Sequence, residues 1–299
     1  MKSLSNNISF TRLGFLIKKE LKEYRKTFML RSFILVAALI LLSIFVGTAH
    51  SDDYARTLQN IRSSHSHKYE AENYEYHGDA HLQAFGVPND DAKKVLLLTF
   101  TFAFPIAIAL SCSFAFERMN SKQKRISFLM TPATVLEKYL ARLLIVIPGT
   151  LIIFFLGCFI SDLVRVLLFS MSYQYGIVQF IDASAFHEIF FDSKSFWTGP
   201  FPIIATLSLF ISSVFTLGSS IWPKASFLKT AGACAALFFF YLIIFLMVFP
   251  RHGQPLIGVI LDDPNSAATF VNTLFILASI FNFTLSYFRL KESEIIQRM

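Results

Sequence analysis

Residues 127–160 read SFLMTPATVLEKYLARLLIVIPGTLIIFFLGCFI, and this stretch decides the fold. Its second part, residues 143–160, contains no charged residue and is long enough to cross the hydrocarbon core of a bilayer, about 30 Å thick, as an α-helix. Its first part is polar and holds a proline, two threonines and a Glu-Lys pair. The stretch therefore predicts a helix that begins in a short polar turn and runs directly into a membrane.

The polar turn carries a signal for the start of a helix. Thr134 and Glu137 have the spacing of a capping box, in which the threonine hydroxyl accepts from the Glu137 N–H and the Glu137 carboxylate accepts from the Thr134 N–H. Alternatively, Thr131 is the N-cap and Pro132 takes the first helical position, which its fixed φ favours. In both interpretations a helix starts here and continues into the span.

Five further stretches share the apolar character of residues 143–160. The chain of 299 residues is 54% hydrophobic and 16% charged, with a mean hydropathy of +0.54, which is too apolar for an ordinary soluble domain. Because lipid offers the backbone no hydrogen-bond partner, each stretch should cross as a helix. We predict an all-α polytopic membrane protein that forms a single transmembrane domain over residues 1–299. Its six predicted spans are residues 32–49, 95–116, 143–160, 201–222, 230–249 and 269–288.

The basic residues are distributed unevenly between the two predicted sides of the membrane. With the N-terminus placed inside, the inner segments hold 19 of the 27 Lys and Arg residues, and such an excess marks the cytoplasmic side. We therefore expect both termini in the cytoplasm. This distribution also explains the net charge of +7, so we expect the lipid bilayer as a partner and no nucleic acid.

The segment before the first span, residues 12–28, has the pattern of a basic amphipathic helix. Its lysines and arginines lie off the face that carries its apolar side chains, and helices of this kind rest on the inner membrane surface. The alternative interpretation is a basic run that only fixes the orientation of the first span. The apolar face consists of Leu13, Leu16, Ile17, Leu21, Tyr24 and Phe28.

The predicted outer segments contain all seven histidines. His77 and His81 have the spacing of two metal ligands on one helical face, but Gly78 between them disfavours a helix, so we expect a solvated loop without a metal. After the third span, Asp162 and Arg165 should mark the outer boundary. The sequence DLVRVLLFSM that contains both is apolar enough to extend the helix.

The order of these segments resembles that of the permease subunits of ABC-2 type exporters, especially a branch of short bacterial permeases. In that branch the loop after the second span reads like LPAS-x-x-EK, and the basic N-terminal sequence KKELKEYRKT resembles the interfacial helix of the same family. The matching loop residues here are Pro132, Ala133, Thr134, Glu137 and Lys138, with Thr134 in place of the serine.

The resemblance implies a permease of the bacterial cytoplasmic membrane that forms a transport pathway as a homo- or heterodimer and binds a separate ABC ATPase. Its cytoplasmic loop, residues 117–142, would dock into a cleft of that ATPase and turn ATPase closure into tilting of the second and third spans. The chain has no G-x-x-x-x-G-K-[ST] sequence, so we expect it to be no enzyme and to leave ATP and Mg²⁺ to the partner. The residues assigned to coupling are Glu117, Arg118, Arg125, Phe128, Leu129, Met130, Pro132, Thr134, Glu137 and Lys138.

Polar side chains within the spans allow two interpretations. They bind neighbouring helices, as Ser and Asn do in membranes, or some of them line a transport path for an amphipathic or lipid-like cargo. Pro105 and Pro148 should kink the second and third spans, which either helps these helices pivot or eases their packing. The candidate path residues are Ser111, Ser113, Ser208, Ser212, Thr216, Asn272 and Asn282.

Two other functions compete with the exporter. A membrane scaffold or immunity protein without an ATPase partner would bind its target through the outer loops. A membrane-embedded enzyme would use the outer histidines. An ATPase that co-purifies with the chain would separate the exporter from both.

Overall fold

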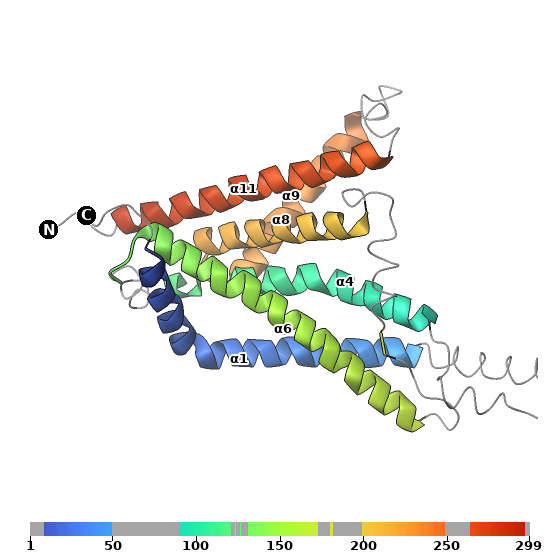
Figure 1. Ribbon diagram of the computed structural model, residues 1–299. Helices are drawn as coiled ribbons and strands as arrows, with labels where there is room; N and C mark the ends of the chain where they lie inside the picture. Colours follow the sequence, from blue (N-terminus) through green and yellow to red (C-terminus); the bar gives the residue numbers. More distant parts are fainter. Residues whose placement is uncertain are drawn as a thin grey trace, which may run out of the picture. The chain divides into compact units, whose positions relative to one another are not determined.

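The computed structural model describes six long helices and one short one (Figure 1). Within the described part of the chain there are only helices, turns and bends, which confirms the all-α prediction. The elements are α1 (Phe10–Ala49), α4 (Asp90–Ser113), the 3₁₀ helix η1 (Glu117–Asn120), α6 (Val135–Ser172), α8 (Pro200–Ile221), α9 (Ser226–Val248) and α11 (Pro264–Ile296). The described residues are 9–49, 90–120, 123, 126, 131–172, 180–181, 199–248 and 264–296.

Each of the six long helices is long and apolar enough to cross a membrane, as predicted. Several boundaries differ from the predicted ones, and three of the differences bear on the fold. Helix α4 ends at Ser113, before the predicted limit at residue 116, because the chain tightens into turns in which the Ala115 N–H donates to the Cys112 carbonyl (3.0 Å). Helix α6 continues to Ser172, as the apolar DLVRVLLFSM sequence indicated. The amphipathic segment and the first span form one uninterrupted helix, α1.

Helix α8 is apolar outside and polar inside, the inverse of a helix in a soluble protein. Among its large apolar side chains, Leu209 and Ile221 are exposed and the others are half-buried. Lipid tails are as apolar as leucine, so burying these side chains against protein brings no hydrophobic gain, whereas small residues let helices approach closely. The buried residues of α8 are Pro202, Thr206, Ser208, Ser212, Ser213, Thr216, Gly218 and Ser219.

Part of the hydroxyl face of α8 packs against α11, and the two helices run parallel (Figure 1). The Thr206 hydroxyl donates to Asn272 Oδ1 (2.9 Å), and Asn282 Nδ2 donates to the Ser213 hydroxyl (3.2 Å). Residue numbers rise together along both helices, which requires a parallel arrangement. Successive spans cross a membrane in opposite directions. Because α9 lies between α8 and α11 in the sequence and runs back across, α8 and α11 must point the same way.

The folded chain consists of two compact units. Unit 1 comprises Met1–Phe28, Phe104–Ile152 and Ser193–Met299, and unit 2 comprises Met29–Ala103 and Ile153–Asp192. Helices α1, α4 and α6 contribute residues to both.

Within unit 2, α1 and α6 also pack in parallel through small residues. The Ser161 hydroxyl donates to the Leu39 carbonyl (2.7 Å), and the Ser43 hydroxyl donates to the Ser161 carbonyl (3.2 Å). One turn away along each helix, Gly157 lies against Leu39 and Gly47 lies against the ring of Phe169. Each helix thus has two small residues four apart at the contact, a spacing typical of close membrane-helix packing.

Asp162 and Arg165 form a buried ion pair within α6. Arg165 Nη2 donates to Asp162 Oδ1 (2.6 Å), while Asp162 Oδ2 accepts from the Ile181 N–H (2.9 Å). Twenty residues of helix separate Arg142 from Asp162, a rise of about 30 Å that equals the hydrocarbon thickness of a bilayer. The pair is therefore compatible with the predicted outer boundary, although it is buried and the helix continues beyond it.

The close approach of α1 and α6 predicts a cost for any larger residue at position 157. A Cβ added at Gly157 would lie 2.9 Å from Leu39 Cδ1. We expect Gly157→Leu to lower the free energy of unfolding by about 1–3 kcal/mol through overpacking, measured by thermal unfolding in detergent. Gly232→Leu on α9 is the matched control, since nothing lies within 4 Å of a Cβ there. Equal melting temperatures for both variants would contradict the packing described here.

Candidate functional site

The α4–α6 connection, residues 114–134, carries most of the residues that the sequence assigns to coupling. Glu117 is half-buried in η1, and Pro132 is exposed in the bends before α6. The side chain of Arg118 lies outside the described residues, as do Arg125 and the predicted apolar tip. That tip consists of Phe128, Leu129 and Met130.

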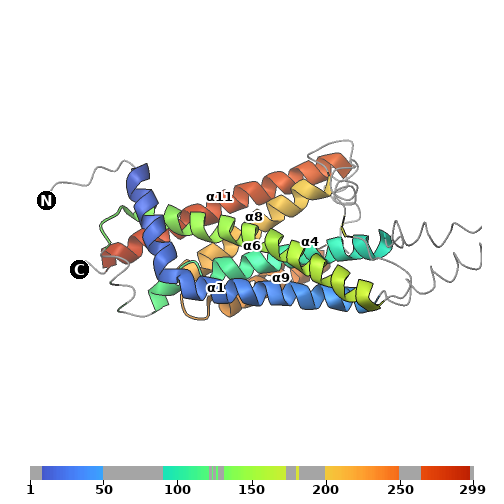
Figure 2. The same ribbon diagram turned by 60° about the horizontal axis from the view of Figure 1, so that its bottom comes forward.

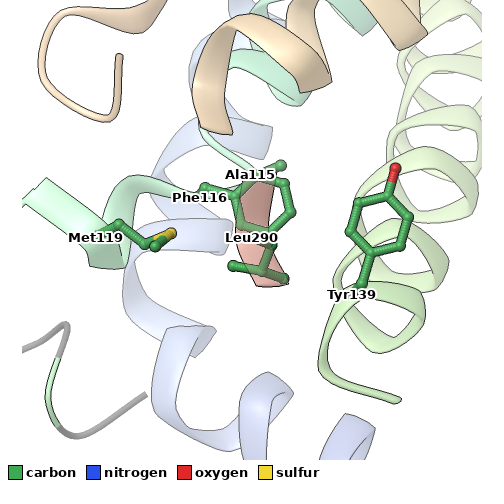
Figure 3. Packing of buried hydrophobic residues seen from close by; sticks show 5 residues of the cluster. All are labelled: Ala115, Phe116, Met119, Tyr139 and Leu290. Carbon is green, nitrogen blue, oxygen red and sulfur yellow. The ribbon is translucent and has the colours of Figure 1, made fainter. Parts of the chain in front are cut away.

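Both ends of the connection are held by one apolar cluster of unit 1, here called the root cluster (Figure 3). The ring of Phe116, just after α4, stacks on the ring of Tyr139 in the first turns of α6, with centroids 6.0 Å apart and planes 8° from parallel. The connection therefore leaves and returns at the same place. The root cluster consists of Ala115, Phe116, Met119, Tyr139 and Leu290.

Tyr139 also ties the root cluster to α11. Its hydroxyl donates to the Phe283 carbonyl (2.8 Å), and its ring meets the edge of Tyr287 at 5.9 Å between centroids. Leu290, one turn beyond Tyr287, is buried in the same cluster. Three helices of unit 1 thus hold the ends of the connection.

The start of α6 has the predicted capping box. The Glu137 N–H donates to the Thr134 hydroxyl (3.2 Å), and the Thr134 N–H donates to Glu137 Oε2 (3.0 Å). Helix α6 begins at Val135, so Thr134 is the N-cap and the alternative start at Thr131 and Pro132 is wrong. The Thr131 carbonyl instead accepts from the Ala133 N–H (2.8 Å) in a tight turn.

The Glu137 carboxylate does more than cap its own helix. Its Oε1 accepts from the Ser9 N–H (3.0 Å) and lies 3.3 Å from Arg12 Nη2. The Glu137 side chain is fully buried, whereas that of Arg12 is 33% exposed. One carboxylate therefore joins the first turn of α6 to the first turn of α1, which lie together in both views (Figures 1 and 2).

A second buried ion pair holds the next turns of the same two helices together. Arg142 Nη2 lies 2.8 Å from Glu20 Oε2, and both side chains are almost completely buried. Between the two ion pairs, Leu13 and Leu16 pack against Ala141. The N-terminal part of α1 is therefore fixed to α6 by two charged contacts and one apolar contact.

These contacts change the interpretation of the amphipathic segment. Leu13 and Leu16 contact protein, which differs from the prediction that the apolar face rests on the membrane. Leu21 is exposed, and the side chain of Tyr24 lies outside the described residues. The signal that was missed is Glu20, which falls on the same helical face as Leu13 and Leu16 and therefore needed a basic partner in protein.

Glu137 and Lys138, assigned to docking, are both buried in the first turn of α6. Their side chains are therefore not accessible to a partner protein in this structure. Glu137 acts on the connection by fixing its end, and Lys138 lies beside it.

The candidate path residues are mostly engaged in packing within unit 1. Asn272 and Asn282 bond to α8, and the hydroxyls of Ser113, Ser212 and Thr216 donate to carbonyls of their own helices. Ser208 is buried, and its hydroxyl has no hydrogen-bond partner within the described part of the chain. Ser111 is half-buried. The contacts favour helix packing over a transport path for this set.

Comparisons with protein families, with curated proteins and with solved structures found no match for this chain. Among the described residues, no three His, Cys, Asp or Glu side chains gather as a metal site would require. The seven histidines lie outside the described residues, so the solvated outer loop stays a prediction.

The network around Glu137 predicts a specific order of stabilities. Glu137→Ala removes the buried carboxylate that accepts from the Thr134 N–H and the Ser9 N–H and pairs with Arg12, so we expect the free energy of unfolding to fall by about 2–4 kcal/mol. Arg12→Ala should cost about 1 kcal/mol, because this partner is partly exposed. Thermal unfolding in detergent measures both changes.

Glu292→Ala is the control for this series, since Glu292 forms an exposed ion pair with Arg289 (3.2 Å) on α11. We expect its effect to stay within about 0.5 kcal/mol. If Glu137→Ala melted at the same temperature as Glu292→Ala, the buried network would not be a stabilising one.

Proposed function

We propose that this chain is the permease subunit of an ATP-driven ABC-2 type exporter in a bacterial cytoplasmic membrane, with both termini in the cytoplasm. The observation that carries the proposal is the anchoring of the α4–α6 connection at both ends. The root cluster joins its two ends to α11, and Glu137 joins its last residue to α1. The residues that resemble the family motif lie at this anchored end.

The anchoring at both ends supports the proposal that the connection acts as a lever. A force applied to the middle of a flexible loop is lost in bending of the loop, whereas a short connection with both ends packed passes the force to its helices. Here the turn that follows α4 is joined to α6 and α11 by Phe116, Tyr139 and Leu290. Closure of an ATPase pair against the connection would therefore tilt membrane helices.

The proposal assigns the chemistry to the partner. The chain lacks the glycine-rich phosphate-binding sequence, so ATP and Mg²⁺ would be bound and ATP hydrolysed on a separate ATPase subunit. The transport pathway would form when two permease copies assemble. Within one copy, Thr206, Ser213, Asn272 and Asn282 are already used in bonds between α8 and α11, which supports a pathway lined by other residues.

Affinity purification of the full chain from its native membrane in gentle detergent tests the proposal. We expect an ATPase to co-purify, and we expect Phe128→Asp to weaken its binding about thirtyfold if Phe128 contributes about 2 kcal/mol as an interface hot spot. Met171→Asp is the control, since Met171 is an exposed apolar residue at the opposite end of α6. It should retain the ATPase.

Two results would contradict the proposal. If no ATPase co-purified with the wild-type chain, the scaffold interpretation would replace the exporter. If an ATPase co-purified equally with wild type, Phe128→Asp and Met171→Asp, the connection would not be its docking element.

A further inference from the structure

The N-terminal part of α1 has one face on protein and one face away from it. Leu13, Leu16 and Glu20 are buried against α6. Successive helical residues are about 100° apart, so the residues on the opposite side are spaced three and four apart from one another. The residues there are Phe15, Lys18, Lys22, Arg25 and Lys26, here called the outward face.

The outward face is strongly cationic. All four of its basic residues are exposed, and Lys19 beside them is exposed as well. The two carboxylates of this segment, Glu20 and Glu23, do not neutralise the basic residues of the outward face. Glu20 is buried with Arg142, and Glu23 pairs at 4.0 Å with Lys19 at the edge. Like charges one turn apart repel each other, and anions bound beside such a row relieve this repulsion.

Apolar side chains accompany these cations. Phe15, within the outward face, is 74% exposed, and Phe10, the first residue of α1, is 85% exposed. Aromatic rings among basic side chains suit the boundary between headgroups and acyl chains. The same helix continues without a break into the first membrane span. Lipid headgroups are therefore the nearest large set of anions.

We propose that the outward face of α1 binds the phosphate headgroups of anionic phospholipids. Clusters of four to eight Lys and Arg residues next to a membrane span attract acidic lipids, each by about a fivefold gain in affinity. The sequence predicted that the apolar side of this segment contacts the membrane, whereas in this arrangement the basic side does. The apolar stripe holds the helix on α6, and the cationic side holds it on lipid.

This inference requires only that the chain spans a membrane. It does not depend on transport or on an ATPase, so it can fail while the proposed function holds, and the reverse is also true.

Native mass spectrometry of the full-length protein in a neutral detergent tests the inference. The delipidated protein is titrated with phosphatidylglycerol, or with phosphatidylcholine as a zwitterionic comparison. We expect tighter binding of phosphatidylglycerol that weakens as salt is raised, because exposed charges are screened. The variant Lys18→Gln, Lys22→Gln, Lys26→Gln should lose on the order of a hundredfold in affinity for phosphatidylglycerol.

The matched control carries Lys224→Gln, Lys229→Gln and Lys291→Gln, which removes the same charge from exposed lysines elsewhere in unit 1. We expect this control to bind phosphatidylglycerol like the wild type. Both variants should keep the elution volume and helical circular dichroism of the wild type, so that a binding change reports on the face and not on folding.

Several outcomes would overturn the inference. Equal binding of the two lipids, or an equal loss in both triple variants, would remove the specific role of the outward face. Displacement of phosphatidylglycerol by millimolar inorganic phosphate would identify a free anion as the ligand. If the outward-face variant kept its lipid but lost a co-purifying acidic protein, the face would be a protein interface.

Discussion

A bilayer offers no hydrogen-bond partner to a polar group and no hydrophobic gain for burying an apolar one, and both consequences are visible in this chain. Large apolar side chains are exposed along the spans, as from Leu237 to Ile244 of α9. Contacts between spans are made by hydroxyls, amides and glycines, such as Thr206 with Asn272 and Ser43 with Ser161. Small and polar residues therefore contribute to the contacts between spans, alongside aromatic pairs such as Phe210 with Phe275.

Charged contacts are concentrated at the start of α6 in unit 1. Glu137 and Arg142 lie within about two turns of each other, and each binds a residue of α1. Removing either charge would leave buried polar groups without partners, which is costly where water is excluded. The arrangement makes the N-terminal part of α1 a structural neighbour of the α4–α6 connection, although more than a hundred residues separate them in sequence.

The two proposals meet on this segment of α1. Its inner side is fixed to the helix that ends the proposed ATPase lever, and its outward face carries the cations proposed to hold lipid headgroups. A helix fixed on both sides in this way would keep the root of the connection at a constant depth in the membrane. A lever needs such a fixed point, because force that moves its support is not passed to the helices beyond it.

The sequence by itself determined the local features: six apolar helices, a sequence after Asp162 apolar enough to extend α6, and a helix start between Thr131 and Glu137, for which the structure chose the capping box of Thr134 over the alternative at Thr131 and Pro132. These follow from spacings of three or four residues and from the length of an apolar run, which need no knowledge of neighbours. Only the tertiary structure decided that Glu137 also binds Ser9 and Arg12, and that Glu20 pairs with Arg142. The same holds for Thr206 and Ser213 of α8, which bond to Asn272 and Asn282 of α11. The physical reason is that the pattern of a span specifies a crossing, and even a face of small and polar residues does not specify which helix it meets, so packing in three dimensions makes that choice.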